Sequence, residues 1–138
     1  MESGMVLANA TDIKIWANRR DAQDQIPRLL RRLIHATCTQ VDRIGFPSDE
    51  SVQSGGYDGV VVIGIENAFL PDACSVWEFG ATINVKGKAD SDYEKRSNDP
   101  LNIDRSNTTF IFVTPRIWGN KNEWAAAKCA EKVWRRCS

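Results

Sequence analysis

The sequence lacks long apolar runs, and this absence argues against a membrane-spanning protein. No stretch of its 138 residues approaches the roughly 18 consecutive apolar residues of a transmembrane helix. The first ten residues also lack the basic start and apolar stretch of a signal peptide. We therefore expect a cytoplasmic protein with no membrane partner.

The motifs of several enzyme classes are missing as well. The four cysteines form no C-x-x-C pair, so we expect free thiols in a reducing compartment rather than a zinc ribbon or a redox motif. His35 is the only histidine, and no serine or cysteine motif accompanies it, which argues against a catalytic triad. Neither G-x-x-x-x-G-K-[ST] nor G-x-G-x-x-G occurs, so the chain has no recognisable nucleotide-phosphate loop.

The composition is that of an ordinary globular domain. Hydrophobic residues make up 42% and charged residues 26% of the chain. We expect a flexible lead-in over residues 1–12 and a single domain over residues 13–138. Lysine plus arginine equals aspartate plus glutamate at 18 each, so only local charge can favour a polyanionic partner. The clearest local excess is a group of arginines near the start of the chain, Arg19, Arg20, Arg28, Arg31 and Arg32.

Hydrophobic periodicity predicts an α/β fold. Apolar side chains between residues 26 and 36 recur at i, i+3, i+4, i+7 and i+8, which is one stripe of a helix. Pro27 fits the first turn of this helix, or a kink if the helix begins near Asp21. In chain order we expect a helix over residues 26–36, strands over 41–46, 57–65 and 75–83, a helix over 86–98, a strand over 108–114 and a helix over 121–133, the order αβββαβα.

Two acidic residues stand out because they occur in apolar strands. Asp58 lies between glycines at the start of a strand, where it is either poised for chemistry or part of a turn; taken alone, the turn is favoured. Glu78 lies between Trp77 and Phe79, so its burial would demand a partner. For Glu78, a role in a functional site is as well supported as the alternative, in which its side chain points outward to solvent or pairs with an arginine. Two carboxylates side by side would favour a divalent cation such as Mg²⁺, which can generate a nucleophilic water on a phosphodiester.

A basic candidate lies on the helix that follows. Lys88, Asp92 and Arg96 recur at i, i+4 and i+8, so they share one helix face, and this face could present Lys88 to the acids. The alternative is an exposed helix with salt bridges on its surface. Without other observations this alternative is favoured.

Taken together, these segments resemble the restriction-endonuclease-like PD-(D/E)XK domains at the N-termini of NACHT-like and other STAND-type bacterial antiphage defence proteins. The resemblance covers nearly the whole chain. The residues that carry it are Trp16-Ala17-Asn18-Arg19, Ala22-Gln23, Pro27, Gly56-Tyr57-Asp58-Gly59, Ser75-Val76-Trp77-Glu78-Phe79-Gly80, Lys88-Ala89, Asp92-Tyr93, Arg96 and residues 109–116.

This resemblance implies a restriction-endonuclease-like core with a mixed central β-sheet flanked by helices. It implies that Asp58 and Glu78 are catalytic acids that hold Mg²⁺, or Mn²⁺, for phosphodiester hydrolysis. The family pattern places a lysine two residues after the second acid, where this chain has Gly80. Lys88 is therefore our candidate for a migrated catalytic lysine, with Lys86 behind it. In the resembling proteins the chain continues into a sensor or ATPase part, with which such a domain would work.

Three hypotheses follow. The first is a Mg²⁺-dependent DNA endonuclease effector domain of an antiphage defence system, in which the arginines named above contact phosphates. The second is a catalytically inactive nuclease-like domain that binds nucleic acid, or a phage protein, through the same basic face. The third is an oligomerisation or adaptor domain, a homo-oligomer included, whose five tryptophans partly form the interface, although most of them are expected in the core.

Overall fold

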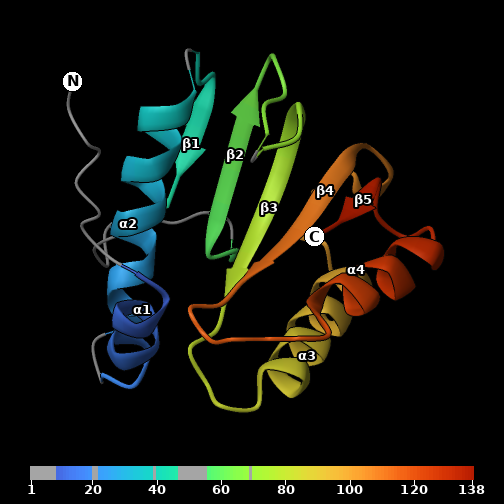
Figure 1. The fold of residues 1–138 in the computed structure, drawn as a ribbon. Helices are drawn as coiled ribbons and strands as arrows, with labels where there is room; N and C mark the ends of the chain where they lie inside the picture. Colours follow the sequence, from blue (N-terminus) through green and yellow to red (C-terminus); the bar gives the residue numbers. More distant parts are fainter. Residues whose placement is uncertain (1–8, 20–21, 39, 47–55, 69) are drawn as a thin grey trace.

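The computed structural model describes residues 9–19, 22–38, 40–46, 56–68 and 70–138 (Figure 1). This part of the chain forms four α-helices, five strands and one short 3₁₀ helix. In order they are α1 (Ala10–Ala17), α2 (Ala22–Thr37), β1 (Arg43–Gly45), β2 (Gly59–Ile63), β3 (Ala73–Phe79), α3 (Val85–Asn98), the 3₁₀ helix η1 (Arg105–Asn107), β4 (Thr108–Val113), α4 (Lys121–Ala130) and β5 (Arg136–Cys137).

The strands form one mixed sheet in the order β1-β2-β3-β4-β5. The pairs β1/β2 and β2/β3 are antiparallel, whereas β3/β4 and β4/β5 are parallel. Parallel neighbours need a crossover connection, and α3 supplies it between β3 and β4. The prediction of a mixed α/β fold is thereby confirmed, together with the predicted chain order of its central elements.

The sheet lies between two helical layers (Figure 1). Helices α1 and α2 lie on one side, which we call the α2 face, and helices α3 and α4 lie on the other, the α3 face. The core of the α2 face contains Ile26, Ile34, Phe46, Val61, Ile63, Trp77 and Phe79. The core of the α3 face contains Val60, Val76, Ala89, Tyr93, Phe110, Phe112, Trp124 and Trp134.

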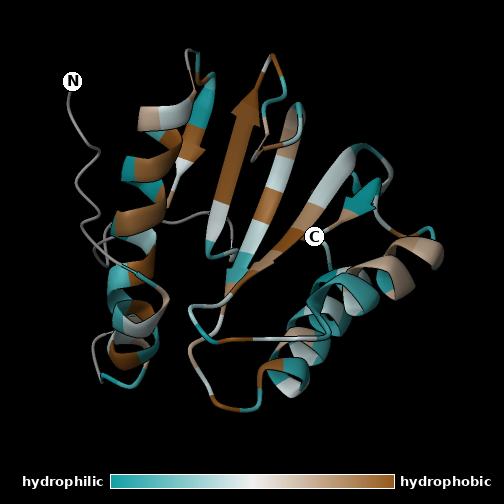
Figure 2. Cartoon of the chain, viewed as in Figure 1, coloured by the Kyte–Doolittle hydropathy of each residue, from teal (hydrophilic) through white to brown (hydrophobic). Residues whose placement is uncertain are grey.

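Alternation along the central strands explains why both faces are apolar. Successive side chains of a strand point to opposite faces, so a β-branched run covered by helices on both sides fills two cores at once. Val60 faces α3, whereas Val61 and Ile63 face α2. The hydropathy colouring shows β2, which lies between β1 and β3, as an almost continuous apolar strand (Figure 2).

Several elements differ from the sequence-based expectation. Helix α1 begins at Ala10, inside the segment expected as a lead-in, and a capping box between Asn9 and Asp12 fixes its start. Helix α2 begins at Ala22, so Pro27 lies within the helix and not in its first turn. The short strand β5 was not predicted. Residues 1–8 of the expected lead-in lie outside the described residues.

Three expectations about the class of protein can be compared with the structure. Among the helices of the described ranges, none is both long enough and apolar enough to cross a membrane. All four cysteines are free thiols, but none of them is buried, and Cys129 is exposed. Trp77, Trp124 and Trp134 are buried, so most of the tryptophans belong to the core and not to an exposed interface.

Candidate functional site

The strand register brings Asp58 and Glu78 together. Gly59 pairs with Trp77 in the antiparallel ladder of β2 and β3, so the next positions along this ladder are Asp58 and Glu78. Asp58 is half-buried, and its Oδ2 accepts a hydrogen bond of 2.8 Å from the backbone N–H of Phe79. This bond ties the start of β2 to the end of β3. Asp58 thus lies in the bend just before β2 and is also a neighbour of Glu78.

Glu78 points into the protein and not to solvent. Its exposed fraction is 4%. Because residues two apart in a strand point to the same face of the sheet, Glu78 lies on the α3 face together with Val76. The guanidinium Nε of Arg96 donates a hydrogen bond to Glu78 Oε1. The expectation of an outward orientation is therefore wrong, and the expectation of an arginine partner is confirmed.

Burial is the main reason that the pKa of Glu78 rises to about 8. A hydrogen bond with the carboxyl of Asp58, and the negative charge of that carboxyl, raise the pKa further, while Arg96 lowers it. A carboxyl with this pKa is largely protonated at neutral pH. A protonated Glu78 does not repel the carboxyl of Asp58.

Lys88 lies directly over Gly80. A Cβ built on Gly80 would lie 2.7 Å from Lys88 Cγ and 2.9 Å from Phe112 Cζ, so no side chain fits at this position beside the lysine. The stem of Lys88 thus runs past the strand position where the family pattern has its own lysine. The Lys88 ammonium donates to Asp92 Oδ1 at 3.1 Å.

Asp92 was not among the predicted site residues. Its exposed fraction is 8%, and its Oδ2 is buried with no hydrogen-bond partner. Burial raises the pKa of Asp92, and the nearby charge of Asp58 adds to this effect, whereas Lys88 lowers the pKa. The carboxylate of Asp92 therefore lies within electrostatic reach of the acid pair while it holds Lys88.

The side of α3 that carries Lys88, Asp92 and Arg96 faces into the protein, which corrects the favoured expectation that this side is exposed to solvent. Asp92 and Arg96 are buried, and Lys88 is only partly exposed. Lys86 supplies the contrast, because it forms its ion pair with Asp90 on the outer side of the helix, with 71% of its side chain exposed. The i, i+4, i+8 spacing predicted the shared face, but it could not tell which way that face points.

The predicted nucleic-acid-binding arginines lie elsewhere. Arg28, Arg31 and Arg32 are exposed on α2, whose apolar side packs on the face of the sheet opposite to Glu78. Arg19 is exposed between α1 and α2. Arg20 lies outside the described residues. The described arginines of this group therefore do not join the acids on the α3 face.

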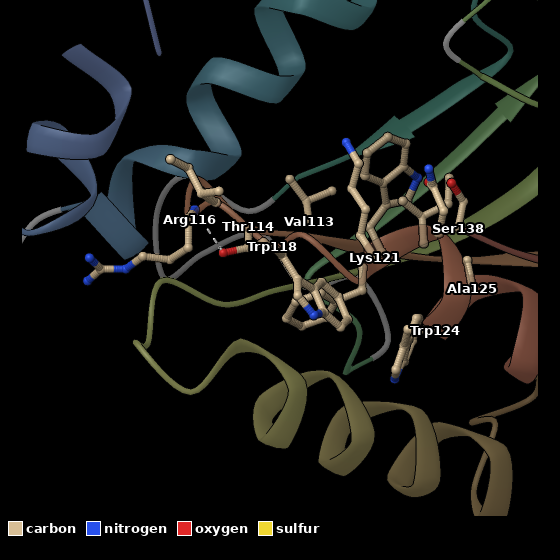
Figure 3. Close-up of a pocket in the computed structure, with 13 residues that line it drawn as sticks. Val113, Thr114, Arg116, Trp118, Lys121, Trp124, Ala125 and Ser138 are labelled. Atoms are coloured by element: carbon tan, nitrogen blue, oxygen red, sulfur yellow. Dashed lines mark hydrogen bonds between the residues drawn. The ribbon is translucent and has the colours of Figure 1, made fainter. Parts of the chain in front are cut away.

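A hollow with aromatic walls lies along β4 (Figure 3). Its volume is about 620 Å³, and its lining includes Phe112, Trp118, Trp124 and Lys121. One of its wall residues, Phe112, pairs with Glu78 in the parallel ladder, but neither acid lines the hollow. The sequence analysis did not predict this hollow, most of whose lining comes from residues 111–125.

The donor set can be compared with the needs of a metal ion. Among the residues that the structure describes, no group of three or more His, Cys, Asp or Glu side chains gathers as a metal site. Mg²⁺ needs fewer protein ligands, since one or two carboxylates with water and substrate oxygens suffice. The backbone and arginine contacts above engage Asp58 Oδ2 and Glu78 Oε1, and the two carboxyls also hydrogen-bond each other. A cation bound by this pair would have to replace the hydrogen bond between the two acids.

Comparisons of the chain with models of protein families, with curated proteins and with solved structures found no match.

Proposed function

We propose that this chain is a Mg²⁺-dependent DNA endonuclease of the PD-(D/E)XK type, acting in the cytoplasm as an effector domain of an antiphage defence system. The observation that carries the proposal is the arrangement around Gly80. Asp58 and Glu78 lie side by side at one end of β2 and β3, and the stem of Lys88 runs past the place where the family lysine would stand.

Each side chain has a defined part in this proposal. Asp58 and Glu78 would hold the cation between their carboxylates, in place of the hydrogen bond that now joins the two acids. Lys88 would bring a positive charge to the reacting phosphate once it leaves Asp92, whose carboxylate holds the ammonium in place. A bound Mg²⁺ would supply a nucleophilic water and neutralise charge on the phosphodiester.

The surface contacts to DNA belong to the same proposal. Arg28, Arg31 and Arg32 present their charges on the outer side of α2, where they suit contacts to phosphates beyond the cleavage point. The aromatic hollow along β4, which includes the strand partner of Glu78 and has Lys121 at its wall, suits an unstacked base and its phosphate.

Cleavage of plasmid DNA in the presence of Mg²⁺ or Mn²⁺ tests the proposal. We expect Asp58→Ala, Glu78→Ala and Lys88→Ala each to lose most of the activity. Lys86→Ala is the matched control, because Lys86 forms an ion pair of the same i, i+4 type on the outer side of α3. Full activity of Glu78→Ala, or an equal loss in Lys86→Ala, would contradict the assigned site.

A second candidate function is supported by the ion pairs themselves. Glu78 has Arg96 as its partner and Lys88 has Asp92, so the charges are already balanced without a cation. This favours a catalytically inactive domain that retains nucleic acid or serves as an adaptor. DNA retention that needs no metal, without cleavage at any metal concentration, would favour this second function.

A further inference from the structure

Arg96 is the residue that connects the two strands bearing the acids. Its Nε donates to Glu78 Oε1, and its Nη2 donates to the backbone carbonyl of Gly56, two residues before Asp58. One guanidinium therefore bonds to the second acid and to the segment that carries the first. Arg96 itself is 7% exposed, so these bonds are shielded from water.

The surroundings of Arg96 hold the guanidinium in this position. Its Cζ lies 4.8 Å from the ring centroid of Tyr57, a cation–π contact. The Tyr57 hydroxyl in turn donates to the carbonyl of Pro100 at 2.9 Å, just beyond the end of α3. Gly56 adopts a φ of +96°, and a Cβ there would lie 2.5 Å from Leu101 Cδ1, so the carbonyl is presented by a backbone shape that favours glycine.

These contacts need an arginine and not merely a positive charge. A guanidinium is a planar fork whose donors point in fixed directions, so it can bond a carboxylate and a carbonyl at the same time. A lysine ammonium is a single point of charge on a flexible stem. It could neutralise Glu78, but it would not fix the distance between Glu78 and the Gly56 segment.

We propose that Arg96 is a positioning residue, which holds the carboxylate of Glu78 at a fixed place relative to Asp58 so that both can bind one divalent cation. This inference rests on the proposed function. Carboxylates that bind metal ions are themselves hydrogen-bonded by outer partners, and loss of such a partner typically lowers metal affinity about 10- to 100-fold. Arg96 contacts Oε1 and leaves Glu78 Oε2 for the cation.

Titration of the purified protein with Mn²⁺, followed by calorimetry and by the electron paramagnetic resonance of the free ion, tests the inference without relying on cleavage. We expect Arg96→Lys to bind Mn²⁺ about 10- to 100-fold more weakly than the wild type. Arg105→Lys is the matched control, because Arg105 also donates to a backbone carbonyl, but to that of Ser97 and not to the segment that carries either acid. Its affinity for Mn²⁺ should equal that of the wild type.

A second pair of variants keeps the inference testable if Arg96→Lys does not fold. Tyr57→Leu removes the ring under the guanidinium, whereas Tyr57→Phe keeps the ring and loses only the bond to Pro100. We expect weaker Mn²⁺ binding in Tyr57→Leu than in Tyr57→Phe.

The outcomes separate this inference from the proposed function. If the wild type binds Mn²⁺ and Asp58→Ala does not, but Arg96→Lys and Tyr57→Leu bind as the wild type does, the acids form the site and the role of Arg96 is refuted. If the wild type does not bind Mn²⁺ at all, the proposed metal site fails, and the role of Arg96 fails with it. A loss confined to Arg96→Lys and Tyr57→Leu, with Arg105→Lys unchanged, supports the inference.

Discussion

The two faces of the sheet bury different kinds of side chain. The α2 face has an apolar core and keeps the arginines of α2 in solvent. The α3 face has an apolar core of similar kind, but it also buries Glu78, Asp92 and Arg96 beside it. Since replacing a buried ion pair by apolar residues is often neutral or stabilising, stability alone does not explain the charges of the α3 face. The buried charges of the α3 face are therefore the feature on which the proposed site depends.

The largest effect is expected from a substitution that breaks the buried ion pair on the α3 face. Arg96→Met should lower the free energy of unfolding by about 3–5 kcal/mol at about pH 9, because Glu78 loses the guanidinium that lowers its pKa and its carboxyl stays buried without a charge partner. Denaturation in urea followed by tryptophan fluorescence measures this. Arg31→Met, on the exposed side of α2, should change stability by less than about 0.5 kcal/mol. Equal losses in the two variants would show that the faces do not differ.

The next effect is a dependence of stability on pH that originates on the α3 face. The pKa of Glu78 in the folded protein is raised to about 8, from an ordinary value of 4.5. Between these values the folded protein keeps a proton that the unfolded chain has lost. The metal-free protein should therefore lose stability as pH rises through this window, by at most about 1.4 kcal/mol per pH unit for one carboxyl.

Thermal unfolding at a series of pH values measures this slope. Burial also raises the pKa of Asp92, which adds a slope of the same sign, so the variant Glu78→Gln is needed to isolate the part due to Glu78. The slope should be clearly smaller in Glu78→Gln. Saturating Mn²⁺ should flatten the slope of the wild type, because a bound cation favours the ionised carboxylate. An unchanged slope in Glu78→Gln would contradict the shifted pKa.

The contrast between the faces also shows what could be predicted from the sequence. The β-branched run of β2 and the ends of α3, expected at residues 86–98 and observed at Val85–Asn98, follow from local patterns of residue type. The two acids were found because charged residues are rare in apolar strands. An arginine partner for Glu78 was one of the alternatives, but Arg96 was not identified as that partner, because the two lie 18 residues apart and α3 has no strong apolar stripe to show which side faces the sheet. Such pairings depend on tertiary packing.

A smaller effect concerns the space above Gly80. Gly80→Ala should destabilise the protein by about 1–3 kcal/mol, because its Cβ would overlap the Lys88 stem and the ring of Phe112. Gly64→Ala is the matched control at the end of β2, where the nearest atom, Asp42 Oδ2, lies 3.8 Å away. The same urea denaturation measures both variants. A loss in Gly64→Ala as large as that in Gly80→Ala would show that crowding by Lys88 is not the cause.

The smallest expected effect is on DNA affinity, and it tests whether residues on both faces of the sheet contribute to DNA binding. If the arginines of α2 contact phosphates, Arg31→Ala should weaken DNA retention and reduce the slope of log affinity against log salt by about 1, with Mn²⁺ affinity and stability unchanged. Fluorescence anisotropy with a labelled duplex at several salt concentrations measures the slope. Lys95→Ala removes an equal charge from the exposed side of α3 and serves as the control. If Lys95→Ala reduces the slope and Arg31→Ala does not, DNA approaches only from the side of α3, and the arginines of α2 have no part in holding it.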